Sequence, residues 1–249
     1  MSQKEFLSSR LEEAALTASR RMMYIFTDFY EPNLQHIIER EIGRYPESDC
    51  TFFGGTEYTE RKMLCVHPKG DAPSQDDFPV DCVQAVLPKN ASVSHPDVLG
   101  AVLGAGIERD KVGDITVRDG LIQVFVASPL GQFICENVTS VSRWDVDMKL
   151  AGKDDIVSYE PVFTEVSVII PSMRIDAVIH AVYRLSRSEA AAFVKGEKVF
   201  IDHEPVTKPG RDVKAGDIIS VRSKGRFIVE SLDGSTKKGN LKITVKRFS

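Results

Sequence analysis

Residues 173–221, near the C-terminus, constrain the fold of this chain more than any other stretch. Four apolar residues recur there at the spacing i, i+3, i+4 and i+7, namely Ile175, Val178, Ile179 and Val182. This spacing predicts a helix with one apolar face, which must be buried against another element. The helix is expected to end near Leu185.

A second helix is predicted over residues 187–195. Ser186 and Glu189 fit a capping box, in which the hydroxyl and the carboxylate each bond to a backbone amide at the start of a helix. Gly196 is placed to end this helix as a left-handed residue. Short β-branched segments follow at 198–202 and 218–221, so the predicted order is helix, helix, strand, loop, strand.

Four phrases in this stretch resemble the S4 RNA-binding domain. They are Arg174-Ile-Asp176, Ser186-Arg-Ser188, Gly196-x-x-Val199 and Val213-Lys-Ala-Gly-Asp217-x-Ile219. The resemblance implies that two short helices and the loop after the first strand form a basic surface that grips structured RNA. The chain departs from the family at Asp202-His203, where the family's strand usually carries an Asn-Gly-like pair.

The resemblance also assigns candidate RNA contacts residue by residue. The matching positions are Arg174, Ser186, Arg187, Ser188, Lys195, Lys198, Lys208, Arg211 and Lys214, and the positive surface extends to Lys224, Arg226, Lys237 and Lys238. A single lysine is better explained as a solvated charge, but nine polar or basic residues on one small layer exceed what solubility requires. Asp176 and Asp217 are expected to be capping and turn residues.

The formal net charge of −4 hides an asymmetry along the chain. Residues 171–249 carry 16 Lys and Arg against 9 Asp and Glu, a balance of +7, whereas residues 1–170 carry 16 against 27, a balance of −11. The signs favour contact between the C-terminal third and a polyanion. The negative balance of the first 170 residues favours contact of that part with solvent or protein.

The chain is predicted to have an α+β fold in three parts. The first, 1–48, is a helical segment with helices over 4–29 and 33–44, and the third, 160–249, is the S4 domain with a closing hairpin. The second, 49–155, contains strands at 50–53 and 62–66 and then a strand, helix, strand, strand, helix, strand pattern. The segments of that pattern are 80–87, 96–103, 114–118, 121–127, 129–138 and 142–150.

The pattern of the middle part is the ferredoxin-like arrangement of RRM domains. RRM domains that bind RNA in the usual way stack bases on aromatic residues of the third and first strands. Here the third strand offers Phe125 alone and the first strand offers none. We therefore expect a domain that shares the RRM topology but does not bind RNA in the usual way, with Phe125 in the core.

Beyond the S4 unit, the chain resembles the YlmH family of bacterial and plastid S4-domain proteins. The matching phrases are Phe52-Phe-Gly-Gly55, Glu60-Arg-Lys62, His95-Pro-Asp-Val-Leu-Gly100, Lys111-x-Gly113-Asp-Ile115, Thr139-Ser140-Val141, Met173-Arg-Ile-Asp-Ala-Val178 and Thr236-Lys-Lys-Gly239. The resemblance implies binding to the large ribosomal subunit, through its rRNA and peptidyl-tRNA, in ribosome-associated quality control of stalled nascent chains.

Two other classes of function stay open on the sequence. Arg174-Ile-Asp176 imitates the arginine-leucine-aspartate phrase of pseudouridine synthases, in which the S4 unit stands first and a catalytic domain follows, whereas here only a hairpin follows. An RNA methyltransferase needs a glycine-rich turn after a strand to admit its nucleotide cofactor. Gly100, Gly104 and Gly106 instead lie on or at the end of a predicted helix. The alternatives are an S4-containing RNA-modification enzyme and a protein adapter.

The sequence predicts no catalytic residue, no cofactor and no metal site. Cys50, Cys65, Cys82 and Cys135 are isolated, which is typical of reduced thiols in a reducing compartment. The N-terminus lacks the apolar core of a signal peptide, and no apolar run is long enough to cross a bilayer. We expect a cytoplasmic monomer with no membrane contact and no small-molecule substrate.

Overall fold

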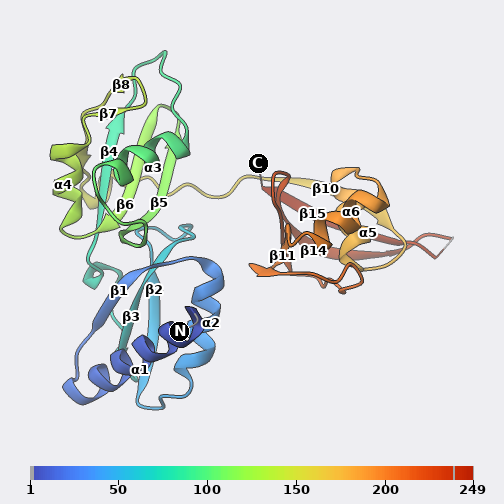
Figure 1. Ribbon diagram of the computed structural model, residues 1–249, viewed down its shortest axis with the longest axis horizontal. Coiled ribbons are helices and arrows are strands. Elements are labelled where there is room, and N and C mark those ends of the chain that lie inside the picture. The colour runs from blue at the N-terminus through green and yellow to red at the C-terminus, as the bar shows by residue number, and fades with distance from the viewer. Residues whose placement is uncertain (1–2, 238, 249) are drawn as a thin grey trace. The chain divides into compact units, whose positions relative to one another are not determined.

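The structure, a computed structural model, describes residues 3–237 and 239–248, with side chains from residue 7 onward. The chain divides into two compact units, unit 1 (Met1–Tyr159) and unit 2 (Glu160–Ser249). Helices and strands occur in both units, as the predicted α+β class requires (Figure 1). Among the described residues, no helix is both long enough and apolar enough to span a membrane.

Unit 1 begins with a three-stranded antiparallel sheet in the order β1-β3-β2. Its elements are α1 (Gln3–Arg21), β1 (Ile25–Tyr30), α2 (Pro32–Ile42), β2 (Ser48–Phe53) and β3 (Lys62–Pro68). Both helices pack on one face of this sheet, because Leu11, Ala15 and Ile38 share a core with Leu64 and Val66.

The prediction of one helix over residues 4–29 is wrong beyond Arg21. Met22 has a φ of 52°, and the chain continues as β1, whose residues are mostly β-branched or aromatic and pair with β3. Strands β2 and β3 also hydrogen bond within this first sheet. The boundary predicted at residue 49 therefore cuts through a sheet that extends to Pro68.

The second part of unit 1 is an antiparallel sheet in the order β5-β6-β4-β9. The elements are η1 (Gln75–Asp77), β4 (Val80–Val86), α3 (His95–Gly104), η2 (Arg109–Lys111), β5 (Val112–Arg118), β6 (Leu121–Ala127), α4 (Leu130–Asn137), β7 (Ser140–Val141), β8 (Trp144–Asp145), β9 (Lys149–Leu150) and η3 (Lys153–Asp155). The predicted ferredoxin-like arrangement is confirmed, with α3 and α4 on one face. The single strand predicted over 142–150 is wrong, because the chain turns at Ser142, where φ is 55°, and forms the β7–β8 hairpin before β9.

The other face of this sheet is covered by residues 151–159, here called the strap. The Gln123 side chain donates to the Val157 carbonyl at 2.9 Å and accepts from the Val157 amide at 3.0 Å. Gln84 donates both to the Gln123 side chain at 2.8 Å and to the Asp155 carbonyl at 3.0 Å. The strap is therefore hydrogen bonded to the face on which RRM domains stack bases.

Phe125 lies on the same face and is 2% exposed, so its prediction as a core residue is confirmed. Gly55, in the loop after β2, lies against its ring: a Cβ at Gly55 would stand 2.1 Å from the nearest ring carbon. Gly55 has a φ of 108°, so only glycine fits there.

Arg61 joins the two parts of unit 1 and is 8% exposed. Its guanidinium donates to the carbonyls of Phe29, Arg109 and Val112 at 2.9–3.2 Å and pairs with Glu31 at 3.1 Å. Burial lowers the pKa of Arg61, and the nearby carboxylates oppose that shift. The arrangement ties both sheets to one buried cation.

Unit 2 is built on an antiparallel sheet in the order β10-β15-β14-β13-β11-β12. Its elements are β10 (Phe163–Ile170), α5 (Ile175–Tyr183), α6 (Arg187–Lys195), β11 (Val199–Ile201), β12 (Glu204–Pro205), β13 (Ile218–Val221), β14 (Gly225–Ser235) and β15 (Leu241–Phe248). Helices α5 and α6 pack on one face, where Val178 and Val194 share a core with Ile219, Phe227 and Ile243. The predicted order of helix, helix, strand, loop and strand is confirmed.

Left-handed residues shape two turns of unit 2. Asp202 and His203, with φ of 47° and 65°, join β11 to β12, and this backbone suits the Asn-Gly pair from which the chain departs. Gly196 has a φ of −85°, so its prediction as a left-handed residue is wrong. Glu197, with a φ of 54°, takes that conformation instead.

Candidate RNA-binding surface

Helices α5 and α6 and the loop 206–217 form the surface predicted to bind RNA. The loop is hydrogen bonded to the start of α5: the Ile175 amide donates to the Arg211 carbonyl at 2.8 Å, and the Asp176 amide donates to the Pro209 carbonyl at 3.3 Å. Lys208 and Arg211 therefore belong to a loop fixed against the N-terminus of α5.

Arg174 stands at the N-cap of α5 and serves a structural contact. Its Nε donates to Oδ1 of Asp176 at 3.1 Å and its Nη2 donates to Oδ2 at 2.8 Å. The Asp176 side chain is 9% exposed, whereas that of Arg174 is 48% exposed. The bond to Asp176 raises the pKa of Arg174. Two of the donor nitrogens of Arg174, which the sequence assigned to RNA, are therefore already bonded to the Asp176 carboxylate.

Ser186 also has a structural role, because the predicted capping box is present at the start of α6. The Glu189 amide donates to the Ser186 hydroxyl at 3.1 Å, and the Ser186 amide donates to Oε2 of Glu189 at 2.8 Å. Ser188 lies 3.0 Å from the same hydroxyl. Hydrogen bonds from Ser186 lower the pKa of Glu189, and Lys224 adds to the shift, which places Lys224 near this end of α6.

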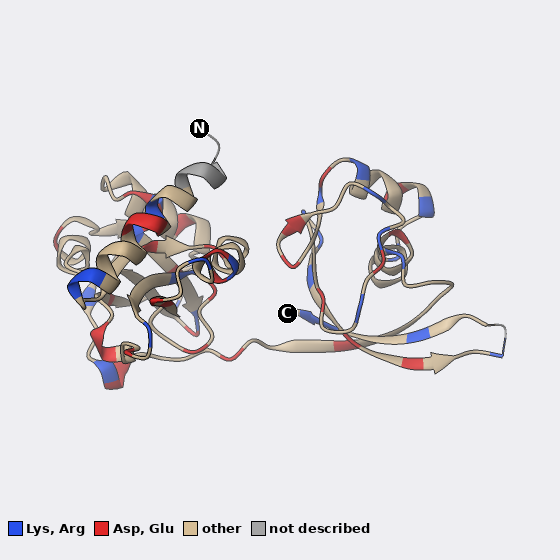
Figure 2. Ribbon diagram, turned by 90° about the horizontal axis from the view of Figure 1, so that it is seen from below, with Lys and Arg blue, Asp and Glu red and all other residues tan. Residues whose placement is uncertain are grey.

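Eight predicted cations are exposed, and none of them forms an ion pair with a described residue. They are Arg187, Lys195, Lys198, Lys208, Arg211, Lys214, Lys224 and Lys237. Two carboxylates of this unit bond to backbone instead: Asp217 accepts from the Lys214 amide at 2.8 Å and Asp202 accepts from the Ile218 amide at 2.9 Å. Figure 2 shows basic residues along the helices and loops of unit 2, with acidic residues among them.

Two of the residues predicted to contact RNA lie away from the surface formed by α5, α6 and the loop 206–217, and a third is not described. Arg226 neighbours the buried Phe227 on β14, so it points to the face of the sheet opposite the helices, where it lies over the Phe248 ring. Lys237 lies in the connection between β14 and β15, which extends beyond the helices in Figure 1. Lys238 lies outside the described residues.

Sequence reasoning missed two arginines that stack on aromatic rings. Arg222 lies 5.4 Å from the ring centroid of Phe200, and Arg247 lies 5.3 Å from that of Tyr183. The predicted Lys198 makes a similar contact, 5.8 Å from the ring of Phe193. These contacts depend on strand register and helix packing, for which no local motif gives a signal.

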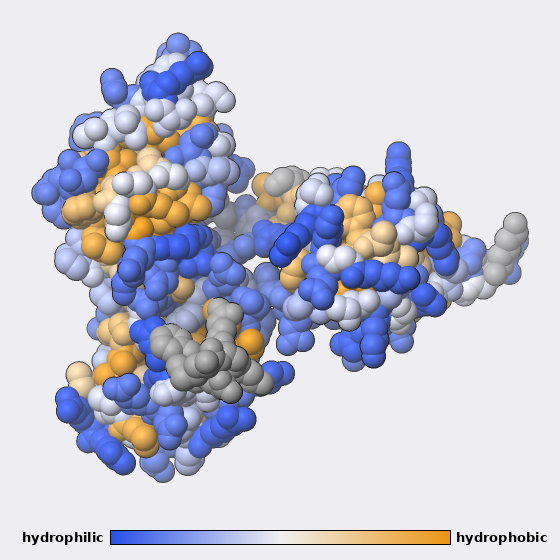
Figure 3. All heavy atoms as spheres, viewed as in Figure 1, coloured by the Kyte–Doolittle hydropathy of each residue, from blue (hydrophilic) through white to orange (hydrophobic). Residues whose placement is uncertain are grey.

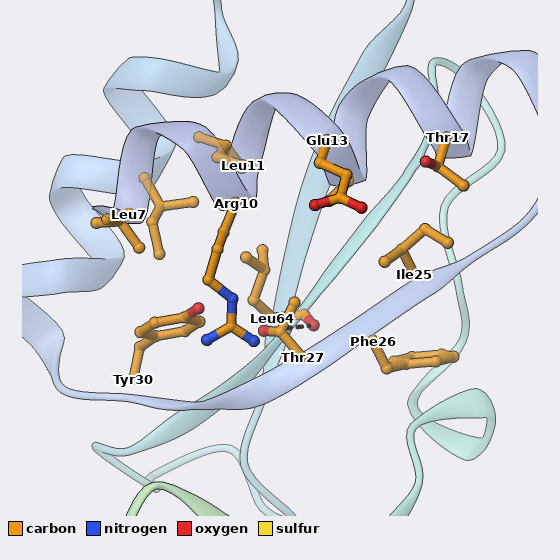
Figure 4. A pocket seen from close by; sticks show the side chains of 12 residues that line it. Leu7, Arg10, Leu11, Glu13, Thr17, Ile25, Phe26, Thr27, Tyr30 and Leu64 are labelled. Carbon is orange, nitrogen blue, oxygen red and sulfur yellow. Dashed lines mark hydrogen bonds between the residues drawn. The ribbon is translucent and has the colours of Figure 1, made fainter. Parts of the chain in front are cut away.

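Unit 1 offers a different kind of surface. A pocket of about 310 Å³ lies between α1 and β1, and its lining is mostly apolar (Figure 4). Arg10 points into this pocket but lies 3.6 Å from the Asp28 carboxylate. In Figure 3, apolar residues gather over α3, where Leu103 is 36% exposed. Neither place shows the unpaired cations of unit 2.

The four cysteines lie in unit 1 as free thiols. Burial raises the pKa of Cys50, Cys65 and Cys82 to about 12, so these thiols stay protonated at neutral pH. Among the described residues, no group of three or more His, Cys, Asp or Glu side chains is arranged to hold a metal ion.

Comparisons with known proteins match a domain in each unit. Residues 73–154 match a family model described as "Putative RNA-binding domain in YlmH", and residues 173–219 match the S4 domain. The Ribosome-associated protein quality control protein P2 of Bacillus subtilis is 28% identical over 247 residues, which cover 98% of this chain and 95% of that protein. A solved structure, the cell division protein ylmH from Streptococcus pneumoniae, covers 64% of this chain and 96% of its own with a TM-score of 0.53; at 18% identity, this likeness concerns the fold.

Proposed function

The chain belongs to the YlmH family of S4-domain proteins, and on that premise we propose that it binds the large ribosomal subunit through unit 2. The ligands would be structured large-subunit rRNA and peptidyl-tRNA. The task would be ribosome-associated quality control of stalled nascent chains, and the protein would act in the cytoplasm as a monomer. The name of the Bacillus subtilis relative supports the ribosomal part of this proposal.

The observation that supports the proposal is the set of eight predicted cations of unit 2 that are exposed and form no ion pair with a described carboxylate. Cations that pair with phosphates release counterions, which supplies affinity without base contacts. Helix-presented and loop-presented arginines and lysines read the shape of a folded RNA more than its sequence. Arg187 and Arg211 are the strongest candidates, because a guanidinium can donate two parallel bonds to one phosphate.

The proposed role is non-catalytic. Asp176, the residue that imitates the pseudouridine synthase nucleophile, is 6% exposed and held at both oxygens by Arg174, so it cannot attack a base. In unit 1, the strap covers the sheet face that RRM domains use for RNA. We therefore assign RNA contact to unit 2.

Co-sedimentation with large subunits in a sucrose gradient tests the proposal. Replacing Arg174 would confuse loss of binding with loss of folding, so the variant is Arg187→Gln, Lys208→Gln and Arg211→Gln combined. The matched control removes three exposed cations of unit 1, by Arg21→Gln, Lys69→Gln and Lys89→Gln. We expect the first variant to leave the large-subunit fraction and the control to remain. Equal sedimentation of both would contradict the proposal.

A further inference from the structure

The sheet face of unit 2 that α5 and α6 leave open carries a continuous row of side chains, here called the outer row. Cross-strand pairing joins Phe200 to Ser220, Ser220 to Arg226, and Phe248 to Phe163. Arg226 and Phe248 are joined by stacking, with the guanidinium carbon 4.5 Å from the ring centroid. The row thus crosses β11, β13, β14, β15 and β10, or about 19 Å at the usual spacing of strands.

The row faces away from the helices, because side chains alternate along a strand. Ile219 and Phe227, the neighbours of row members, are fully buried in the core beneath the helices. The row members themselves stay accessible: Phe163 is 36% exposed, and Phe200 and Phe248 are partly exposed.

Neighbouring side chains of the row contact one another. The Phe163 and Phe248 rings meet edge to face, with centroids 4.9 Å apart and planes at 66°. Arg222 adds a second guanidinium over the Phe200 ring at 5.4 Å. Aromatic rings and guanidinium planes are the groups on which proteins stack unpaired bases.

The charge of unit 2 suits a nucleic acid, since residues 160–249 carry 16 Lys and Arg against 11 Asp and Glu. On the outer face itself the balance is smaller, because Lys246 pairs with Glu230 at 3.0 Å. Stacking, rather than charge alone, must then supply most of the affinity of this face.

We propose that the outer row binds a short run of unpaired RNA by base stacking, as a second contact surface opposite the helix surface. The inference rests on the proposed function in taking RNA as the class of ligand. It goes further in assigning single-stranded RNA to Phe163, Phe200 and Phe248, and folded RNA to the cations of α6 and the loop.

Fluorescence anisotropy on the full chain tests this with two labelled probes, decauridylate and an RNA stem-loop. The variant combines Phe163→Leu, Phe200→Leu and Phe248→Leu, which keeps apolar volume but removes the rings. Phe133→Leu, an equally exposed aromatic in unit 1, is the matched control. Urea unfolding of each protein confirms that the fold is retained.

We expect the triple variant to bind decauridylate at least about tenfold more weakly and the stem-loop within about twofold of the wild-type affinity. The control should match the wild type on both probes. Unchanged decauridylate binding, or equal weakening on both probes, would overturn the inference. If the wild type binds the stem-loop but not decauridylate, the inference fails while the proposed function stands. A wild type that binds decauridylate but not the stem-loop would count against the proposed function.

Discussion

Arg174 holds both carboxylate oxygens of Asp176, with Nε–Oδ1 and Nη2–Oδ2 distances of 3.1 and 2.8 Å. Asp176 is 6% exposed, so removing its partner leaves a carboxylate with little water to replace the bonds. We expect Arg174→Ala to lower the urea midpoint of unit 2. In a double-mutant cycle with Asp176→Ala, the loss of unfolding free energy in the double variant should be smaller than the sum of the two single losses. Strictly additive losses would show that the two side chains do not stabilise the fold as a pair.

Arg61 should be among the most sensitive positions of unit 1. Arg61→Ala removes the side-chain donor to the carbonyls of Phe29 and Arg109 and leaves the Val112 carbonyl with Arg109 Nη1 as its side-chain donor, and we expect the free energy of unfolding to fall by about 3 kcal/mol. Lys153→Ala is the control, since both side chains of its ion pair with Asp76 are exposed, where such pairs contribute about 0.5 kcal/mol. Similar losses for both variants, measured by urea unfolding, would contradict the role of Arg61.

The strap should loosen when Gln123 loses its amide. In Gln123→Leu, the Val157 amide and carbonyl lose both of their side-chain partners, while the apolar volume at the site is kept. We expect amide exchange at Val157 to speed up about tenfold or more, with no change in the core strand β6. Faster exchange over all of unit 1 would mean general destabilisation instead.

The cap of α6 should contribute about 1 kcal/mol. Ser186→Ala removes the acceptor of the Glu189 amide, and the free energy of unfolding of unit 2 should fall by about that amount. Thr207→Ala, in the exposed loop, should have a smaller effect and serves as control.

The same cap predicts a pH dependence. Hydrogen bonds from Ser186 lower the pKa of Glu189 below its ordinary value of 4.5. The unfolded chain therefore takes up the proton first, so this stabilisation is fully present above about pH 4.5 and is lost as the pH falls through the lower, folded pKa. Urea midpoints from about pH 6 to about pH 3 should fall less in Ser186→Ala than in the wild type; parallel curves would rule the linkage out.

The sequence predicted the elements whose signals are local. Apolar spacing located α5, and the Ser186–Glu189 pair located the start of α6, because a helix face and its cap are set within a few residues. The same reasoning failed at β1, where Ile25–Tyr30 follows a good helix without a break such as proline or glycine. Pairing with β3, almost forty residues later, decides the conformation of that segment.

The candidate site was predicted in outline and corrected in detail. Motif matching predicted the exposed cations of α6 and of the loop 206–217. It did not predict that Arg174 pairs with Asp176, because that pairing depends on the burial of Asp176 in the folded domain. The outer row is invisible in the sequence, since Phe163, Phe200 and Phe248 are far apart along the chain and only the register of five strands aligns them.

The most direct test of the account is the salt dependence of binding to purified large-subunit rRNA. Each phosphate contact contributes about −0.9 to the slope of log K against log salt on B-DNA and about −0.7 on single strands, and we expect a value in this range for rRNA. The combined Arg187→Gln, Lys208→Gln and Arg211→Gln variant should therefore lose about 2 to 3 units of slope relative to the wild type, while the Arg21→Gln, Lys69→Gln and Lys89→Gln control keeps it. A wild-type slope retained by the first variant would contradict the assignment of RNA binding to unit 2's helix and loop cations.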